Sequence, residues 1–184
     1  MTLAKESVCR RNKRLNQRIL SNKEVELEEG EIPKAIGHIV QLSVEASACS
    51  SCGTCEVVCA TVHEGATSPS LRRIWLDRFP FEARYITLTC QQCDSPECYF
   101  ACPLKDEALC IDIKTGARYI NGDNCTGCRS CIEACPFDPP RINFDTDRNI
   151  AIKCDLCKDR PNGPACVEFC TTKCLILTEK EQEL

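Results

Sequence analysis

Sixteen of the nineteen cysteines in this 184-residue chain fall into four groups of four. The stretches between the groups contain almost no cysteine, so the arrangement is an internal repeat. Cysteines make up about a tenth of the chain, far above ordinary globular usage, whereas aromatic residues are only 5%. A chain with so few large apolar side chains needs something besides packing to hold its fold, and the cysteine groups are the candidates.

Two of the groups share one spacing and the other two contain an enlarged loop. The groups are Cys49, Cys52, Cys55 and Cys59; Cys90, Cys93, Cys98 and Cys102; Cys125, Cys128, Cys131 and Cys135; and Cys154, Cys157, Cys166 and Cys170. Groups one and three have the bacterial ferredoxin spacing C-x2-C-x2-C-x3-C, in which three thiolates hold one iron–sulfur cube and the fourth ligates a neighbouring cube. The longer loops of groups two and four contain turn residues such as Pro96 and Gly163. The spacing therefore predicts that each cluster takes its cysteine ligands from two groups.

The residues around the cysteines suit anionic sulfur. Small residues let backbone amides point inward, and they are Ser50, Ser51, Gly53, Thr54, Thr126, Gly127 and Ser130. Four cations stand beside the cysteines and could offset cluster charge: Arg129, Lys153, Lys158 and Arg160. The alternative for each cation is an ordinary solvated side chain.

Zinc and disulfides are the competing uses of so many cysteines. Four thiolates can hold a structural zinc ion, but zinc sites usually combine two separated CxxC pairs, whereas groups one and three each place three cysteines within seven residues. Disulfides fit poorly because the odd total leaves one thiol over and the spacings are too tight for bridges within a group. The pattern favours iron–sulfur clusters over both, with a zinc-bound scaffold as the alternative of another class.

Three cysteines stand outside the groups. Cys9 lies in a charged N-terminal segment, Cys110 lies in an apolar run that predicts a strand, and Cys174 follows the last group by four residues. None has ligand spacing, and we expect none of them to bind metal.

The segments between the groups predict short strands and hairpins. Residues 38–44 alternate apolar and polar side chains, and residues 108–120 and 141–153 each read as two strands around a turn. Residues 71–89 form an insertion that could add further strands. Helices are expected to be short and to begin near the fourth cysteine of each group. The expected fold class is α+β.

Residues 1–36 differ from the rest of the chain. Five basic residues between Arg10 and Arg18 precede five acidic residues between Glu24 and Glu31. This segment is either a flexible tail or an arm that orders on a partner, with Leu15, Ile19 and Leu20 as its apolar face. We expect three parts: the arm at 1–36, the cysteine-rich domain at 37–178 and a short tail at 179–184.

Composition and motifs exclude several functions. The formal charge of −4 provides no basic surplus for binding nucleic acid. No apolar run predicts a transmembrane segment or an export signal, so we expect a soluble cytoplasmic protein. The histidines are only His38 and His63, and phosphate-binding or dinucleotide fingerprints are absent. We expect His63 to be structural, no catalytic residues, and no enzyme activity of its own.

At these four groups the sequence resembles the four-cluster ferredoxin-like subunits of molybdenum and tungsten pterin enzymes, the family of the dimethyl sulfoxide reductase and formate dehydrogenase iron–sulfur subunits. The resemblance covers residues 38–178. It implies two pseudo-symmetric ferredoxin-like halves and four [4Fe-4S] clusters. The implied ligand sets are set I, Cys49, Cys52, Cys55 and Cys170; set II, Cys59, Cys154, Cys157 and Cys166; set III, Cys90, Cys93, Cys98 and Cys135; and set IV, Cys102, Cys125, Cys128 and Cys131.

The sequence departs from the family at two positions. Ala60 and Thr171 stand where a proline often follows the fourth cysteine, as Pro103 and Pro136 do in this chain. These departures change turns and remove no ligand.

The resemblance implies an electron-transfer subunit of an oxidoreductase complex. Its partners would be a larger catalytic subunit with a molybdenum or tungsten pterin, and a further redox protein such as a ferredoxin. A tungsten aldehyde oxidoreductase or the benzoyl-CoA reductase of strict anaerobes would be compatible, and formate dehydrogenase, hydrogenase and carbon monoxide dehydrogenase remain open. The alternative is a free-standing polyferredoxin that serves several enzymes.

Overall fold

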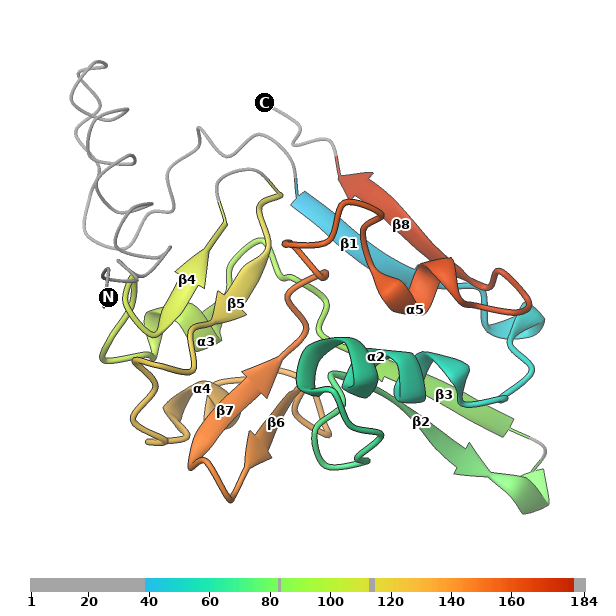
Figure 1. Cartoon of the computed structure of the whole chain (residues 1–184), viewed down its shortest axis with the longest axis horizontal. Coiled ribbons are helices and arrows are strands. Elements are labelled where there is room, and N and C mark those ends of the chain that lie inside the picture. Colours follow the sequence, from blue (N-terminus) through green and yellow to red (C-terminus); the bar gives the residue numbers. More distant parts are fainter. Residues whose placement is uncertain (1–38, 83, 113–114, 181–184) are drawn as a thin grey trace, which may run out of the picture.

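The computed structural model describes residues 39–82, 84–112 and 115–180, and its strands form four antiparallel pairs (Figure 1). The pairs are β1 (Ile39–Val44) with β8 (Leu175–Lys180), β2 (Ile74–Phe79) with β3 (Arg84–Thr89), β4 (Leu109–Ile111) with β5 (Arg118–Ile120), and β6 (Ile142–Asp145) with β7 (Ile150–Lys153). Short strands combined with short helices confirm the α+β class. The predicted arm at residues 1–36, the C-terminal residues 181–184 and Cys9 lie outside the described residues.

The first and last strands of the described chain pair with each other. Val44 lies opposite Leu175 and Leu42 opposite Leu177, and both Leu42 and Leu175 are buried. The strand predicted at 38–44 is therefore present from Ile39. The pairing brings the loop of group one next to the end of group four.

The predicted hairpins are confirmed. Residues 108–120 contain β4 and β5, and residues 141–153 contain β6 and β7. The insertion at 71–89 forms β2 and β3, joined through a 3-10 turn at Pro80–Glu82. Asp145 ends β6 inside the ladder, and its Oδ1 accepts hydrogen bonds from the backbone N–H groups of Asp147 and Arg148, which closes the turn.

The positions expected for the helices are wrong. The helices are α2 (Thr54–Glu64), α3 (Glu97–Phe100), α4 (Ser130–Glu133) and α5 (Ala165–Glu168). Each begins one residue before the third cysteine of its group, not near the fourth. The residue just before each helix explains this start, because Gly53 and Arg129 adopt left-handed conformations and the other two are Pro96 and Pro164. Such residues turn the chain and leave the next residue free to start a helix.

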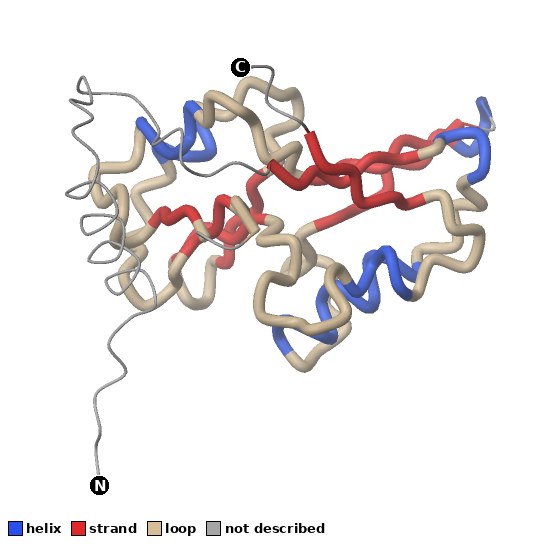
Figure 2. Tube along the Cα trace, turned by 90° about the horizontal axis from the view of Figure 1, so that it is seen from above, coloured by secondary structure: helices blue, strands red, loops and turns tan. Residues whose placement is uncertain are grey.

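The buried residues form two separate main cores. One contains Leu42, Ile74, Leu156 and Leu175, and the other contains Leu109, Ile142 and Ala151. Helix α2 packs on α5, and α3 packs on α4. Figure 2 shows the strands toward the middle of the molecule and the helices toward its outside. Cysteines belong to both cores, so each core adjoins the predicted ligands.

Candidate iron–sulfur sites

Three of the four predicted ligand sets line a pocket of their own. Set IV lines a pocket together with Pro103, Ile120 and Ala151. Set I lines a second pocket, and set III lines a third. Each pocket takes three cysteines from one group and one from another, which is the exchange between groups that the resemblance implied. The cysteines come from the loops before the short helices, from their first turns and from just beyond their ends.

The cysteines of set II also converge. Cys59, Cys157 and Cys166 are buried, and the charge of Cys59 and of Cys157 acts on the thiol of Cys166. Cys154 is in turn close enough to Cys166 for their charges to interact. All sixteen cysteines of the four sets have free thiols. The structure therefore brings together the residues of every predicted set.

Burial holds most of these thiols protonated in the absence of a cation. It raises the pKa of Cys55 and of Cys131 to about 12, and the negative charge of neighbouring residues adds to the effect in each case. Burial also raises the pKa of Cys154 well above its ordinary value. A metal centre deprotonates the thiols that coordinate it. Positively charged iron would therefore stabilise the thiolate form of these buried cysteines. The donor chemistry therefore fits iron–sulfur clusters.

The most exposed cysteines lie at two different sites. Cys52 of set I and Cys128 of set IV are exposed. Hydrogen bonding with Thr54 lowers the pKa of Cys52 to about 6, and hydrogen bonding with Ser130 lowers the pKa of Cys128. The small hydroxyl residues expected in these loops thus stabilise thiolates at the surface.

Two backbone amides are directed at buried or half-buried sulfur atoms. The N–H of Arg73 donates to Sγ of Cys59 at 3.3 Å, and the N–H of Arg141 donates to Sγ of Cys135 at 3.2 Å. Such bonds favour the thiolate and stabilise added negative charge on a cluster. Neither arginine was named from the sequence, because each lies in a segment without cysteine.

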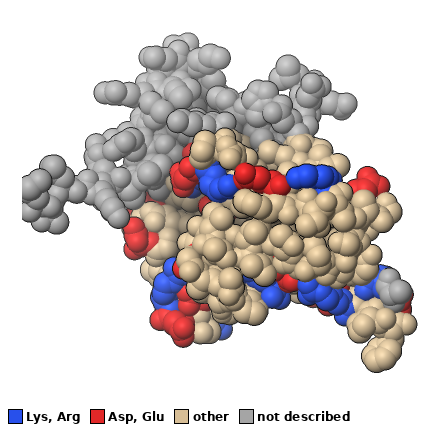
Figure 3. All heavy atoms as spheres, turned by 45° about the vertical axis from the view of Figure 1, so that its right-hand side comes forward, with Lys and Arg blue, Asp and Glu red and all other residues tan. Residues whose placement is uncertain are grey.

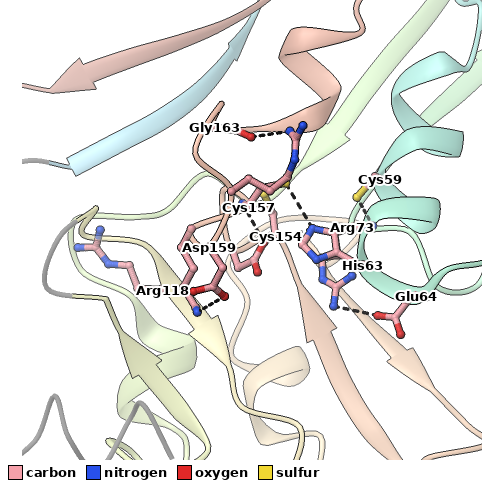
Figure 4. A network of polar contacts seen from close by, with 12 residues as sticks. Cys59, His63, Glu64, Arg73, Arg118, Cys154, Cys157, Asp159 and Gly163 are labelled. Carbon is pink, nitrogen blue, oxygen red and sulfur yellow. Dashed lines mark hydrogen bonds and ion pairs between the residues drawn. The ribbon is translucent and has the colours of Figure 1, made fainter.

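His63 lies against set II (Figure 4). Its Nε2 is 3.4 Å from Sγ of Cys157 and 3.4 Å from Oδ1 of Asp155. Burial lowers the pKa of His63, although the Asp155 carboxylate opposes the shift. Beside it, the guanidinium of Arg73 is paired with Glu64 at 2.9 Å. His63 is therefore held at a candidate ligand, a contact that its position after group one did not reveal.

Of the four cations named from the sequence, Lys153 contacts a candidate ligand. Its Nζ lies 4.0 Å from Sγ of Cys98, and the side chain is 3% exposed. Burial alone would lower the pKa of Lys153, but the charges of Cys90 and Cys98 outweigh burial and raise it. Arg118, also 3% exposed, lies within electrostatic reach of set III. Set III is thus flanked by two buried cations.

The other three cations are held by different groups. Arg129 stacks 4.0 Å from the centre of the Phe144 ring, and Lys158 pairs with Asp159. Arg160 pairs with Glu168 and donates to the carbonyl of Gly163.

The four sets follow one another in space. Cys55 of set I packs on the buried core that contains Cys166 of set II, and Cys98 of set III packs on the core that contains Cys131 of set IV. The charge of Cys90 of set III acts on Cys154 of set II. Between sets II and III, the buried side chain of Gln92 donates to the carbonyl of Cys154 at 2.7 Å and accepts from the N–H of Arg118 at 2.7 Å. The order is therefore I, II, III, IV, with the exposed cysteines in the two outer sets.

The two described spare cysteines differ from each other. Cys110 lies buried in β4, as its sequence predicted. Cys174 lines the pocket of set I, and its Sγ lies 3.5 Å from Sγ of Cys170. Cys174 has no ligand spacing in the sequence, because its approach to Cys170 depends on a reversal of the chain at Lys173, which has φ 54°.

Comparisons with known proteins agree with this chemistry. Residues 81–180 match the family model described as a 4Fe-4S dicluster domain. A putative electron transport protein of Escherichia coli, YsaA, is 35% identical over 150 residues, covering 75% of this chain and 88% of the relative. The polyferredoxin-like subunit of an aliphatic sulfonate oxidoreductase of Pyrococcus furiosus is 39% identical over 122 residues, covering 66% of each chain. A solved benzoyl-coenzyme A reductase active-site complex, BamBC, aligns with a TM-score of 0.49 at 25% identity, covering 79% of this chain and 83% of that one.

The described residues contain no helix with the length and apolar character needed to cross a bilayer.

Proposed function

The chain belongs to the 4Fe-4S dicluster domain family, and we propose that it is the electron-transfer subunit of a molybdenum or tungsten oxidoreductase, with four [4Fe-4S] clusters on sixteen cysteines. Groups two, three and four lie within the matched residues and group one lies before them. Relatives named as electron transport proteins support an iron–sulfur carrier without catalysis of its own.

The observation that carries the proposal is the order of the four cysteine sets. Cysteines of sets I and II adjoin one buried core, Gln92 of the set III loop donates to the carbonyl of Cys154 of set II, and cysteines of sets III and IV adjoin the second core. A [4Fe-4S] cluster bound at such a site supplies a centre that takes up and releases one electron. The paired packing of α2 with α5 and of α3 with α4 supports two ferredoxin-like halves, each holding two sets.

The chain's own residues would tune the two inner sites. The amide N–H of Arg73 would stabilise negative charge at set II, and the ammonium of Lys153 would do so at set III. The imidazole of His63 lies against Cys157 of set II. Burial of Cys59, Cys90, Cys157 and Cys166 keeps water from the same sulfur atoms. Hydrogen bonding, burial and charge are the means by which proteins set cluster potentials.

The outer sets would exchange electrons with other proteins. Cys52 and Cys128 are the exposed members of sets I and IV, so they mark the two ends of the path. One end would meet the catalytic subunit and the other a further redox protein such as a ferredoxin.

A surface near set I suits the catalytic subunit. Exposed large apolar side chains lie on α2, just after α5 and on β8: Val57, Val62, Phe169, Ile176 and Leu177. Phe81 is fully exposed in the turn between β2 and β3. Figure 3, which brings this side of the molecule forward, shows a broad uncharged band between two rows of charged residues. Ile176 and Leu177 alternate across the β1–β8 pair, so these side chains lie on more than one face, and exposed apolar side chains of this kind favour a protein partner.

The relative from Pyrococcus furiosus supports an oxidoreductase partner, because its name makes it a subunit of such an enzyme. The charge balance of −4 supports a protein partner rather than nucleic acid. We place the chain in the cytoplasm, where so many free thiols remain reduced. The domain predicted at 37–178 would extend to the end of β8 at Lys180, because Glu179 and Lys180 pair with β1, and it would be preceded by the arm at 1–36. The tail predicted at 179–184 would then be shorter.

Anaerobic purification of the native particle from its source tests the partner. The iron, zinc, molybdenum and tungsten contents of the intact particle are measured by elemental analysis. The proposal expects about sixteen irons per copy of this chain, a larger subunit, and molybdenum or tungsten. A lone iron-containing chain would instead indicate a free-standing polyferredoxin, and zinc in place of iron would overturn the electron-transfer role.

A further inference from the structure

The pocket of set I contains a fifth cysteine. Cys174 lines it together with Cys49, Cys52, Cys55 and Cys170. Its side chain is 4% exposed, so its thiol is shielded from solvent. The pocket of set III is lined by its four predicted cysteines and no other, and so is the pocket of set IV. The extra thiol thus distinguishes set I from those two sites.

The backbone fixes Cys174 at this position. The N–H of Lys173 donates to the carbonyl of Cys170 at 3.3 Å, and Lys173 adopts a left-handed conformation that reverses the chain. The carbonyl of Cys174 then accepts a hydrogen bond from the N–H of Glu45 at 2.8 Å, next to the pairing of Val44 with Leu175. The thiol is therefore held at the end of a strand pair and does not depend on a mobile loop.

The two sulfur atoms are close enough to exchange roles. Sγ of Cys174 lies 3.5 Å from Sγ of Cys170, within hydrogen-bonding distance for sulfur. Cys174 belongs to the same buried cluster as Cys170, against which Cys49 and Cys55 pack. Either sulfur atom could therefore serve as the ligand after a small side-chain movement.

We propose that Cys174 is a reserve ligand for the iron that Cys170 holds, an inference that rests on the cluster assignment under the proposed function. In the exchange Cys174 would take the place of Cys170 as the thiolate that holds the iron. The thiol proton of Cys174 would pass to the sulfur of Cys170, so no electron would be gained or lost. The reserve thiol protects the cluster whose ligand Cys52 is exposed at the surface.

Iron content and spectroscopy of single-cysteine variants test the proposal. The full chain is purified anaerobically as wild type, Cys170→Ala, Cys174→Ala, the double variant, and Cys135→Ala as the matched control. Cys135 is likewise the fourth cysteine of its group, but Pro139 stands four residues after it. Iron per chain is measured by elemental analysis, and three-iron clusters by electron paramagnetic resonance.

We expect Cys170→Ala to keep the wild-type iron content and to show no three-iron signal. Cys135→Ala and the double variant should each lose at least one iron per chain. If Cys170→Ala loses iron as the double variant does, the reserve role is overturned. If the wild type itself contains clearly fewer than about sixteen irons per chain, the proposed function fails first. The two failures are therefore distinguishable.

A second measurement covers the case in which Cys170→Ala does not fold. Cys174→Ala retains all sixteen proposed ligands and should purify with the wild-type iron content. It should then lose iron to a chelator faster than wild type after mild oxidation, because no second thiol can hold the iron. Equal rates of loss would overturn the proposal, and so would a Cys174→Ala protein that lacks a cluster from the start.

Discussion

The ammonium group of Lys153 lies 4.0 Å from the sulfur of Cys98, a residue 55 positions earlier in the chain. The side chain is buried at the end of β7, and Cys154 of set II follows it directly. Lys153 therefore places a positive charge where sets II and III meet. Positive charge stabilises the reduced, more negative state of a nearby cluster.

Removing this charge should lower the midpoint potential of one cluster. We expect Lys153→Met to shift the potential of the set III cluster downward by on the order of 100 mV, the equivalent of about 2 kcal/mol of charge stabilisation in a one-electron couple. Lys153→Arg should retain most of the wild-type potential. Redox titration followed by electron paramagnetic resonance measures the change.

The exposed Arg84 provides the control for that titration. It pairs with Glu82 in the hairpin turn, and Arg84→Met should leave every potential unchanged. An unchanged set III potential in Lys153→Met would contradict the role of Lys153.

Gly127, in the loop of set IV, has no space for a side chain. Its φ is +71°, and a Cβ atom there would overlap the carbonyl oxygen and side chain of Asn149. We expect Gly127→Ala to displace the loop between Cys125 and Cys128 and to lower the iron content by at least one iron per chain. Gly65 has a similar φ of +66° but open space around it, so Gly65→Ala should keep all iron and cost only about 1 kcal/mol of stability. Equal iron contents in the two variants would show that the close approach of Asn149 is unimportant.

Glu56 joins the helix that bears Cys55 and Cys59 to the β2–β3 hairpin. It is 8% exposed, and it accepts hydrogen bonds from the N–H of Leu76 at 2.9 Å and from Arg78 at 2.7 Å. Glu56→Ala leaves the Leu76 donor unsatisfied and should cost about 1–3 kcal/mol of stability. The midpoint of anaerobic thermal denaturation, followed by cluster absorbance, should fall accordingly.

Two further variants serve as controls. One removes the charge of Glu56 and keeps an acceptor, and the other removes an exposed ion pair. Glu56→Gln keeps an acceptor for Leu76 and should lose less stability than Glu56→Ala. Glu82→Ala breaks only the exposed pair with Arg84 and should change stability by less than about 1 kcal/mol. A larger loss in Glu82→Ala than in Glu56→Ala would contradict this account of α2.

Cys128 should be required at the outer end of the path. Cys128→Ser should remove or damage the set IV cluster and stop electron transfer through that end, while clusters at sets I and II stay detectable by electron paramagnetic resonance. Ser130→Ala is the matched control, because it removes only the hydroxyl 3.5 Å from the same sulfur and should keep the cluster. Unchanged spectra and electron transfer in Cys128→Ser would count against its assignment as a ligand.

Local sequence signals predicted most of the scaffold. The alternation in 38–44 and the turn within 141–153 depend on neighbouring residues, so β1 and the hairpins were located correctly. The expected helix starts are wrong because the turn residues before the helices, Gly53 and Pro96 among them, also suit a ligand loop and give no separate signal for a helix start.

Contacts between distant segments could not be predicted in this way. His63 meets Cys157 across 94 residues, and the amide of Arg73 meets Cys59 from the next segment. The approach of Cys174 to Cys170 is local, but it requires a left-handed residue at Lys173, and lysine gives no signal for that conformation. The chemistry of the sites could therefore be predicted from the spacing, whereas the residues that surround them required the fold.

The most direct measurement is the iron and acid-labile sulfide content of the anaerobically purified chain. Four [4Fe-4S] clusters on the sixteen cysteines of sets I–IV predict about sixteen irons and about sixteen sulfides per chain, with no stoichiometric zinc. About eight irons would contradict the assignment of four clusters, and zinc without sulfide would contradict an iron–sulfur protein altogether.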